Sequence, residues 1–291
     1  MDSFSNYHPI INFIYFTSVI VFSMFFMHPI FQTIAIISAF IYSIILNEKK
    51  GLAYMLPLLI FMAILNPLFN HAGSTILFYF KNGNPFTLES MIYGIASAVM
   101  FVTVILWFSC HNEIMTSDKI IYLFGSIIPS LSLIFSMVLR FVPRYIEQIK
   151  IISNSQKAIG RDITQGNIIQ RAKNGLKILS IMITWALENS IETADSMKAR
   201  GYGLPGRTSF SIFRFDKRDK IVLLVLLMLI IIILIGAFWG ENTIRFFPSI
   251  KLPSITVYSV IVYMAYFLLC MLPVIINIQE AIKWRSIKSK I

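Results

Sequence analysis

The chain has 291 residues, of which 57% are apolar and only 13% are charged. Soluble proteins average about 45–50% apolar and about 25% charged residues, so this composition excludes an ordinary soluble domain. The 25 Lys and Arg residues outnumber the 14 Asp and Glu residues, and the resulting net charge of +11 has to lie outside a bilayer. The two cysteines, Cys110 and Cys270, are too few and too far apart for a disulfide framework or a cysteine-ligated metal site.

Six apolar stretches are long enough to cross a bilayer as helices, which takes about 20 residues each. Each of the first two follows a His-Pro pair, His8-Pro9 or His28-Pro29, which is typical of a helix start. The sequence therefore predicts an all-α integral membrane protein with about six transmembrane helices. The predicted spans cover residues 10–27, 29–46, 52–69, 90–109, 220–240 and 255–277.

A seventh apolar stretch, 120–139, is interrupted by a glycine, a proline and four serines. These residues favour a bend or close helix packing over a plain lipid-facing span. If Lys49 and Lys50 face the cytoplasm, the fourth span ends on that side, and the basic segment after Arg140 lies there too. A stretch that starts and ends on one side cannot cross once, so 120–139 is predicted to be re-entrant or interfacial.

Positive charge is concentrated in two places. The segment from Arg140 to Lys220 holds 15 of the 25 basic residues and 7 of the 14 acidic ones, and four more basic residues lie among the last nine. Cytoplasmic loops of membrane proteins carry an excess of Lys and Arg, so both places are expected on the cytoplasmic side of the cell membrane. The charge is thus assigned to a membrane surface rather than to nucleic acid.

The chain then divides into three parts. Residues 1–139 hold the N-terminal transmembrane helices, 140–219 form a cytoplasmic segment, and 220–291 hold a C-terminal transmembrane helix pair with a basic tail. The cytoplasmic segment has the apolar period of long amphipathic helices. One is expected to begin at Pro143, and a longer one is expected over 168–200.

The same short motif ends both of these amphipathic helices. Ser155-Gln156-Lys157-Ala158-Ile159-Gly160 and Ser196-Met197-Lys198-Ala199-Arg200-Gly201 share the pattern S-x-K-A-x-G. Each copy alone is explained by helix capping, because glycine supplies a left-handed stop and a cation suits the negative end of a helix. The shared Ser and Ala exceed what capping requires. They favour docking of both helix ends on two similar acidic sites of a dimeric cytoplasmic partner.

With these motifs the chain resembles the transmembrane (T) component of energy-coupling factor transporters, a family that includes membrane subunits of cobalt and nickel uptake systems. In that family, Ala-Arg-Gly triplets end the cytoplasmic coupling helices and contact a pair of ABC ATPases. Ala199-Arg200-Gly201 matches the second triplet, whereas Ile159 stands where the first has arginine, and Arg161 follows the glycine. The resemblance also rests on residues 66–73 (NPLFNHAG), Thr87-Leu88-Glu89, Tyr93-Gly94 and Arg140-Phe141-Val142-Pro143.

The resemblance implies a non-catalytic coupling subunit of an ATP-driven uptake transporter for a vitamin or a metal ion. It implies two ABC-type ATPase subunits, or a homodimer, on the cytoplasmic side, and a small membrane-embedded substrate-binding (S) component. At the first helix end, Arg161 or Lys157 replaces the missing arginine, or the contact is mainly apolar. The expected ATPase-docking residues are Lys157, Ala158, Ile159, Gly160, Arg161, Lys198, Ala199, Arg200 and Gly201.

Two other classes stay open, a self-contained secondary transporter or channel and an intramembrane enzyme. The first needs ionisable groups or broken helices at mid-membrane, but the interior of the six stretches contains no Asp, Glu, Lys or Arg. The second needs a nucleophile or metal constellation within a span, and the sequence contains no H-E-x-x-H and no Cys/His cluster. It also lacks G-x-x-x-x-G-K-[ST], so no phosphate-binding loop is encoded. No catalytic residue, metal ligand or cofactor is expected, and the coupling subunit is favoured.

Overall fold

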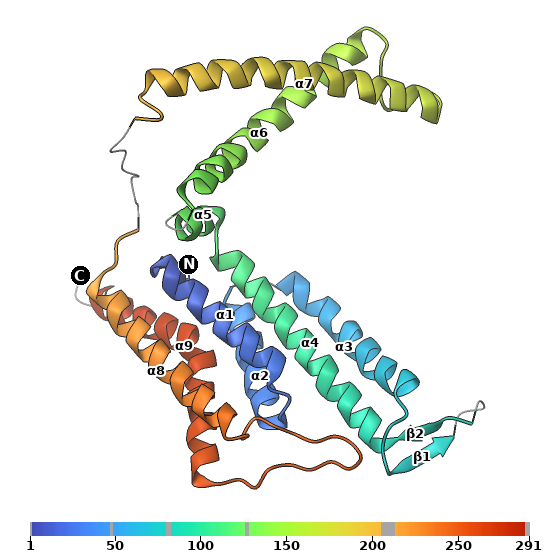
Figure 1. Cartoon of the computed structure of the whole chain (residues 1–291), viewed down its shortest axis with the longest axis vertical. Coiled ribbons are helices and arrows are strands. Elements are labelled where there is room, and N and C mark those ends of the chain that lie inside the picture. The colour runs from blue at the N-terminus through green and yellow to red at the C-terminus, as the bar shows by residue number, and fades with distance from the viewer. Residues whose placement is uncertain (1, 47–48, 80–82, 126–127, 205–212, 289–291) are drawn as a thin grey trace. The chain divides into compact units, whose positions relative to one another are not determined.

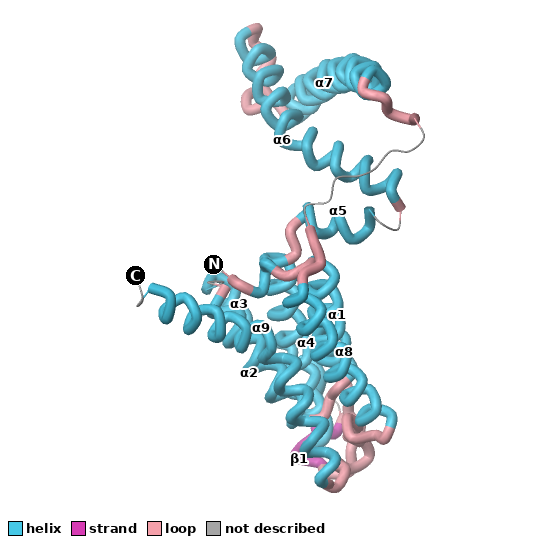
Figure 2. Tube along the Cα trace, turned by 90° about the vertical axis from the view of Figure 1, so that its left-hand side faces the viewer, coloured by secondary structure: helices cyan, strands magenta, loops and turns pink. Residues whose placement is uncertain are grey.

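The protein, represented by a computed structural model, is described over residues 2–46, 49–79, 83–125, 128–204 and 213–288. The chain divides into two compact units, residues 1–120 with 213–291 and residues 121–212. Figures 1 and 2 show the helices of both units and the short strands of the first unit. The elements are η1 (Phe4–Asn6), α1 (Pro9–Phe25), α2 (Pro29–Ile45), α3 (Lys49–Phe69), β1 (Ile76–Tyr79), β2 (Pro85–Thr87), α4 (Leu88–Ile114), α5 (Ser117–Gly125), α6 (Pro129–Ala158), α7 (Ile168–Ala199), α8 (Lys217–Phe238) and α9 (Val257–Lys288).

The apolar helices of the first unit account for all six predicted spans. Among the described residues, α4, α8 and α9 are long and apolar enough to cross a membrane. Shorter apolar helices cover Pro9–Phe25, Pro29–Ile45 and Pro57–Phe69. The prediction of an all-α membrane protein is confirmed.

Two helix starts follow directly from the His-Pro pairs. Pro9 and Pro29 occupy the first positions of α1 and α2, where the missing N–H of proline costs nothing. His8 Nδ1 accepts a hydrogen bond from the Ile10 N–H at 3.3 Å, and His28 Nδ1 accepts one from the Ile30 N–H at 3.4 Å. Both histidines therefore cap helices.

Aromatic side chains fill the core of the first unit. Trp107, Tyr15, Tyr42 and Tyr266 are among the largest fully buried side chains, and the rings of Tyr15 and Trp107 meet edge to face at 6.1 Å. The Tyr15 hydroxyl donates to the Cys270 carbonyl oxygen at 3.0 Å, which satisfies a polar group inside the core. The core thereby joins α1, α2, α4 and α9.

At one end of the first unit, the start of the chain lies beside the ends of three helices. Lys119 is buried, and its Nζ donates to the Ser5 carbonyl oxygen at 2.6 Å and to the Ile114 carbonyl oxygen, the last residue of α4, at 3.0 Å. At the start of α8, the Arg218 guanidinium lies 4.3 Å from the Tyr7 ring centre and 3.5 Å from Glu280 of α9. The beginning of the chain, the end of α4, the start of α8 and the later part of α9 therefore share this end.

At the opposite end, the loop between α3 and α4 contacts the loop between α8 and α9. The Ser74 N–H donates to the Pro248 carbonyl oxygen at 3.1 Å, and the Tyr93 ring packs edge to face against Phe246 at 5.1 Å. Figure 2 shows the strands and these loops together, away from the N-terminus. Between the third and fourth predicted spans, β1 and β2 form an antiparallel hairpin, which was not predicted from the sequence.

In the second unit, the structure corrects the expected start of the first amphipathic helix. The helix begins at Pro129 and continues through Pro143 to Ala158 instead of starting at Pro143. Both prolines fit a first helical position, but only Pro129 occupies one. An interior proline removes a single backbone hydrogen bond, and a 30-residue helix retains the others. The placement of 120–139 relative to the membrane stays a prediction.

Candidate functional site

The second half of α6 packs against the middle of α7 (Figure 1). Ile152 of α6 and Ile178 and Met182 of α7 form a small buried cluster. Beside it, the rings of Tyr145 and Trp185 meet edge to face at 5.5 Å. This contact holds the two helices together while the C-terminal end of each helix remains exposed at the surface of the unit.

Both C-terminal ends adopt the same hydrogen-bonded turn. After α6, the Gly160 N–H donates to the Lys157 carbonyl oxygen at 3.0 Å, and the Arg161 N–H donates to that of Gln156 at 2.9 Å. After α7, the equivalent bonds run from Gly201 to Lys198 at 2.9 Å and from Tyr202 to Met197 at 3.0 Å. This pair of bonds defines the Schellman motif. The repeated sequence motif is therefore also a repeated backbone structure.

The glycines explain why both turns close. Gly160 has a φ of +77° and Gly201 a φ of +82°, in the left-handed region that other residues enter only with strain. The predicted docking residues fall into matching positions. Lys157 and Ala158 end α6, as Lys198 and Ala199 end α7, and Ile159 and Arg200 are the two C-cap residues.

The side chains on the two turns differ in order. The exposed C-cap side chain is apolar Ile159 in the first turn and cationic Arg200 in the second. Two positions further on, the order is reversed, with Arg161 in the first turn and Tyr202 in the second. Among the described residues, neither arginine forms an ion pair. Each turn thus presents one exposed arginine beside one apolar or aromatic side chain.

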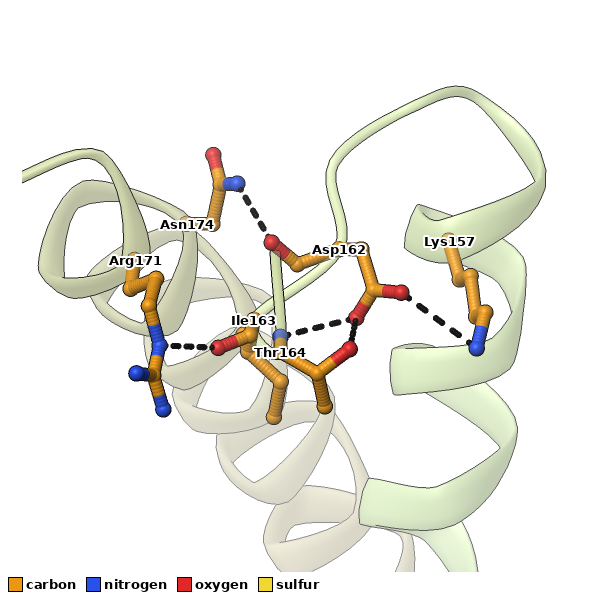
Figure 3. Close-up of polar contacts among 6 residues, drawn as sticks. All are labelled: Lys157, Asp162, Ile163, Thr164, Arg171 and Asn174. Carbon is orange, nitrogen blue, oxygen red and sulfur yellow. Dashed lines mark hydrogen bonds and ion pairs between the residues drawn. The ribbon is translucent and has the colours of Figure 1, made fainter. Parts of the chain in front are cut away.

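In the first turn, Lys157 forms an ion pair with Asp162 of the loop that follows (Figure 3). Lys157 Nζ lies 3.3 Å from Asp162 Oδ2. Asp162 Oδ1 accepts hydrogen bonds from the Thr164 N–H at 2.9 Å and the Thr164 hydroxyl at 2.8 Å. The hydrogen bonds from Thr164, with a smaller contribution from Lys157, hold the pKa of the Asp162 carboxyl below its ordinary value. The carboxylate therefore stays ionised at neutral pH.

The loop that follows is fastened to α7, as Figure 3 shows. Arg171 Nε donates to the Ile163 carbonyl oxygen at 2.8 Å, and Asn174 Nδ2 donates to that of Asp162 at 2.9 Å. These loop contacts were not predicted from the sequence. The pattern Asp162-x-Thr164 is typical of a side-chain-stabilised turn and is the signal that could have revealed part of them.

A groove adjoins the second turn. It has a volume of about 550 Å³ and is lined by the first half of α6 and the last part of α7. Arg140 and Arg144 of α6 line it together with Arg200, while Glu192 contributes one negative charge. The surface next to the second turn is therefore predominantly positive. In the described parts of the chain, no group of three His, Cys, Asp or Glu side chains is placed to hold a metal ion.

The apolar helices and the paired helix ends define a membrane-embedded protein with a separate helical unit. Comparison with known proteins gives its family. The energy-coupling factor transporter transmembrane protein EcfT 1 of Listeria monocytogenes serotype 1/2a is 30% identical over 185 residues, which cover 59% of this chain and 68% of the relative. EcfT of Lacticaseibacillus paracasei is 29% identical over 182 residues, covering 58% of this chain and 68% of the relative.

A shorter and more similar match involves EcfT of Lactobacillus helveticus, which is 35% identical over 97 residues, or 33% of this chain and 35% of the relative. No protein-family model matches the chain. The chain belongs to the EcfT family and is the transmembrane (T) component of an energy-coupling factor transporter.

Proposed function

We propose that this chain couples ATP hydrolysis on partner ATPases to the movement of a substrate-binding membrane subunit during uptake of a vitamin or a metal ion. The partners are two ABC-type ATPase subunits, or a homodimer, and a small S component in the membrane. The observation that carries the proposal is the pair of Schellman turns with the same backbone hydrogen bonds, each presenting an exposed arginine. Two like turns suit two like sites on a dimer.

The end of the first unit that holds Lys119 and Arg218 is assigned to the cytoplasmic side. The basic residues at the start of α8 and along the end of α9 lie at this end, and cytoplasmic loops are rich in Lys and Arg. This assignment supports the division into 1–139, 140–219 and 220–291, with the middle segment and the C-terminus in the cytoplasm. The 70–89 hairpin and the 241–254 loop then lie outside.

Specific residues are given separate roles. Arg200 is the main ATPase contact at the second turn, and Gly201 shapes the turn beneath it. At the first turn, Arg161 takes the electrostatic role, because Lys157 is engaged with Asp162. Ile159 adds an apolar contact, since 62% of its side chain is exposed.

ATP hydrolysis is assigned to the partner chains. The sequence has no P-loop, and residues 201–207 (GYGLPGR) lack the lysine and the spacing that a phosphate cradle needs. Membership of the EcfT family also favours a coupling subunit over a self-contained secondary transporter, channel or intramembrane enzyme.

The test is charge reversal at Arg200. If Arg200 makes a buried charge-assisted contact with an ATPase, Arg200→Glu costs about 2–5 kcal/mol of binding, or about 30-fold or more in affinity. ATPase co-purification and transport are therefore expected to fall while the subunit remains in the membrane. Lys177→Glu is the matched control, because Lys177 is an exposed cation on the same helix but away from the turn. Equal ATPase recovery with Arg200→Glu and Lys177→Glu would contradict the assignment.

A further inference from the structure

The β-hairpin between α3 and α4 presents an apolar strand to its surroundings (Figure 1). All four side chains of β1 are exposed, with exposed fractions of 46% at Ile76, 49% at Leu77, 50% at Phe78 and 64% at Tyr79. A two-stranded hairpin is marginally stable in water, and an exposed apolar edge strand promotes aggregation. Contact with an apolar medium would remove both disadvantages.

The base of the hairpin is rigidly fixed. The Thr75 N–H, the Thr75 hydroxyl and the Ser74 hydroxyl all donate to the buried Glu89 carboxylate, the shortest of these bonds being 2.8 Å. The Thr87 hydroxyl donates to the Ala72 carbonyl oxygen at 2.7 Å. These contacts tie the hairpin to the first turn of α4, so the strand is a structured extension of that helix.

The exposed strand continues the exposed apolar surface of the two flanking helices. Leu68 and Phe69 at the end of α3 are 48% and 80% exposed, and Met91 and Ile92 near the start of α4 are 43% and 37% exposed. Exposed apolar side chains on membrane helices face lipid, and aromatic residues concentrate at the membrane–water interface. On β1 and β2, the rings of Phe78 and Phe86 stack at 4.6 Å.

Unpaired backbone groups limit how deeply the hairpin can enter a bilayer. The outer edge of β1 has no neighbouring strand among the described residues, and unpaired backbone groups are not tolerated in the hydrocarbon core. We propose that the hairpin lies in the headgroup region of the bilayer, with Leu77 and Tyr79, which share one face of β1, dipping toward the acyl chains. The occupant of this surface is lipid, and the hairpin fixes the depth of the adjoining ends of α3 and α4.

A spin-label experiment tests this proposal. The native Cys110 and Cys270 are buried, so a nitroxide reagent reacts selectively with an introduced cysteine. Leu77→Cys and Tyr79→Cys are labelled in the full chain, purified with its accompanying subunits and reconstituted into phosphatidylcholine–phosphatidylglycerol vesicles. Ile95→Cys on the exposed apolar side of α4 is the lipid control, and Glu188→Cys on α7 is the aqueous control. Collision rates with oxygen and with a water-soluble nickel chelate are measured by power saturation.

Labels at both hairpin positions are expected to show an oxygen-to-nickel collision ratio well above that of Glu188→Cys and below that of Ile95→Cys. A ratio equal to that of Glu188→Cys would place the hairpin in water and overturn the proposal. Exclusion of both reagents would show that another protein subunit covers the strand, and this result would overturn it equally. Because both side chains are exposed, neither cysteine substitution removes a core contact.

Discussion

Lys157 Nζ lies 3.3 Å from Asp162 Oδ2, and among the residues that the structure describes this ion pair has no counterpart at the other helix end. Lys198 occupies the position of Lys157 in the second turn, but the position of Asp162 is taken by Gly203, which has no side chain. The two turns therefore share a backbone and differ in how their charges are arranged. The first turn has an internal brace from Asp162, and the second has no carboxylate at the equivalent position.

The brace is expected to stiffen the loop that follows α6. Asp162→Asn removes the carboxylate that Lys157 and Thr164 share, so backbone amides over 160–165 should exchange with deuterium faster. Hydrogen-exchange mass spectrometry of the loop measures this. Asp195→Asn on the exposed face of α7 is the control and should leave the loop unaffected. An unchanged exchange rate in Asp162→Asn would contradict the bracing role.

The same carboxylate predicts a pH dependence. The hydrogen bonds from Thr164 lower the pKa of Asp162 below its ordinary value of 3.8. The stabilisation from the ionised carboxyl is thus complete above that ordinary value and is lost as the pH falls through the lowered one. Loop exchange, corrected for the intrinsic rate, should therefore be the same at pH 5 and pH 7. A loss of protection already at pH 5 would show that the carboxyl titrates higher than the structure indicates.

Replacement of either turn glycine by alanine should lower the stability of the protein, whereas the same replacement inside α7 should raise it. Gly160→Ala and Gly201→Ala force alanine into the left-handed region, which costs about 1–2 kcal/mol. The Gly201 variant should be the worse, because its new Cβ would lie 3.2 Å from Leu204 Cδ1, whereas Gly160 faces open space. Gly175→Ala, within α7 and with open space around it, should instead stabilise the helix by about 0.5–1 kcal/mol. Thermal unfolding separates the three; equal effects would contradict the turn assignment.

The first turn offers a rescue experiment. Arg161→Glu should weaken ATPase binding less than Arg200→Glu does, because Ile159 retains an apolar contact. Adding Ile159→Arg to Arg161→Glu restores an arginine at the C-cap, the position that Arg200 holds in the second turn. This double variant should recover much of the lost binding in a co-purification assay. Failure to recover, with the single variant impaired, would mean that the position of the charge matters more than its presence.

Helix packing in the first unit gives a stability prediction. A Cβ at Gly236 of α8 would lie 2.6 Å from Val262 Cγ2 of α9, closer than packed atoms allow. Gly236→Ala should therefore destabilise the protein by about 1–3 kcal/mol through overpacking. Val262→Ala removes the two clashing methyl carbons, so the double variant should regain part of the loss. A double variant no more stable than Gly236→Ala would show that the contact with the Val262 methyl groups does not cause the loss of stability.

The membrane helices could be predicted from the sequence because each needs little more than a long apolar run. The hairpin was missed although an Asn-Gly pair at 82–83 follows shortly after the apolar run 76–80, and such a pair is typical of hairpins. The start of α6 was misplaced because Pro129 and Pro143 fit a first helical position equally well. Local sequence does not distinguish a proline that begins a helix from one that a long helix tolerates.

The candidate site was predicted in its pattern but not in its details. The S-x-K-A-x-G repeat predicted two equivalent helix ends, because glycine in the left-handed region leaves a recognisable signature. The roles of Lys157 and Arg161 could not be separated, since the ion pair with Asp162 depends on how the loop folds back. Likewise, Arg171 and Asn174 contact the loop only once α6 and α7 have packed together.

The most direct test of the account is photo-crosslinking from the helix ends themselves. A photoreactive amino acid is introduced at Ile159 or Tyr202, whose side chains are exposed on the first and second turns, and at Leu187, exposed in the middle of α7. In membranes containing the assembled transporter, Ile159 and Tyr202 should crosslink to an ATPase subunit and Leu187 should not. Crosslinks from both turns to the S component or to lipid, with none to an ATPase, would contradict the account.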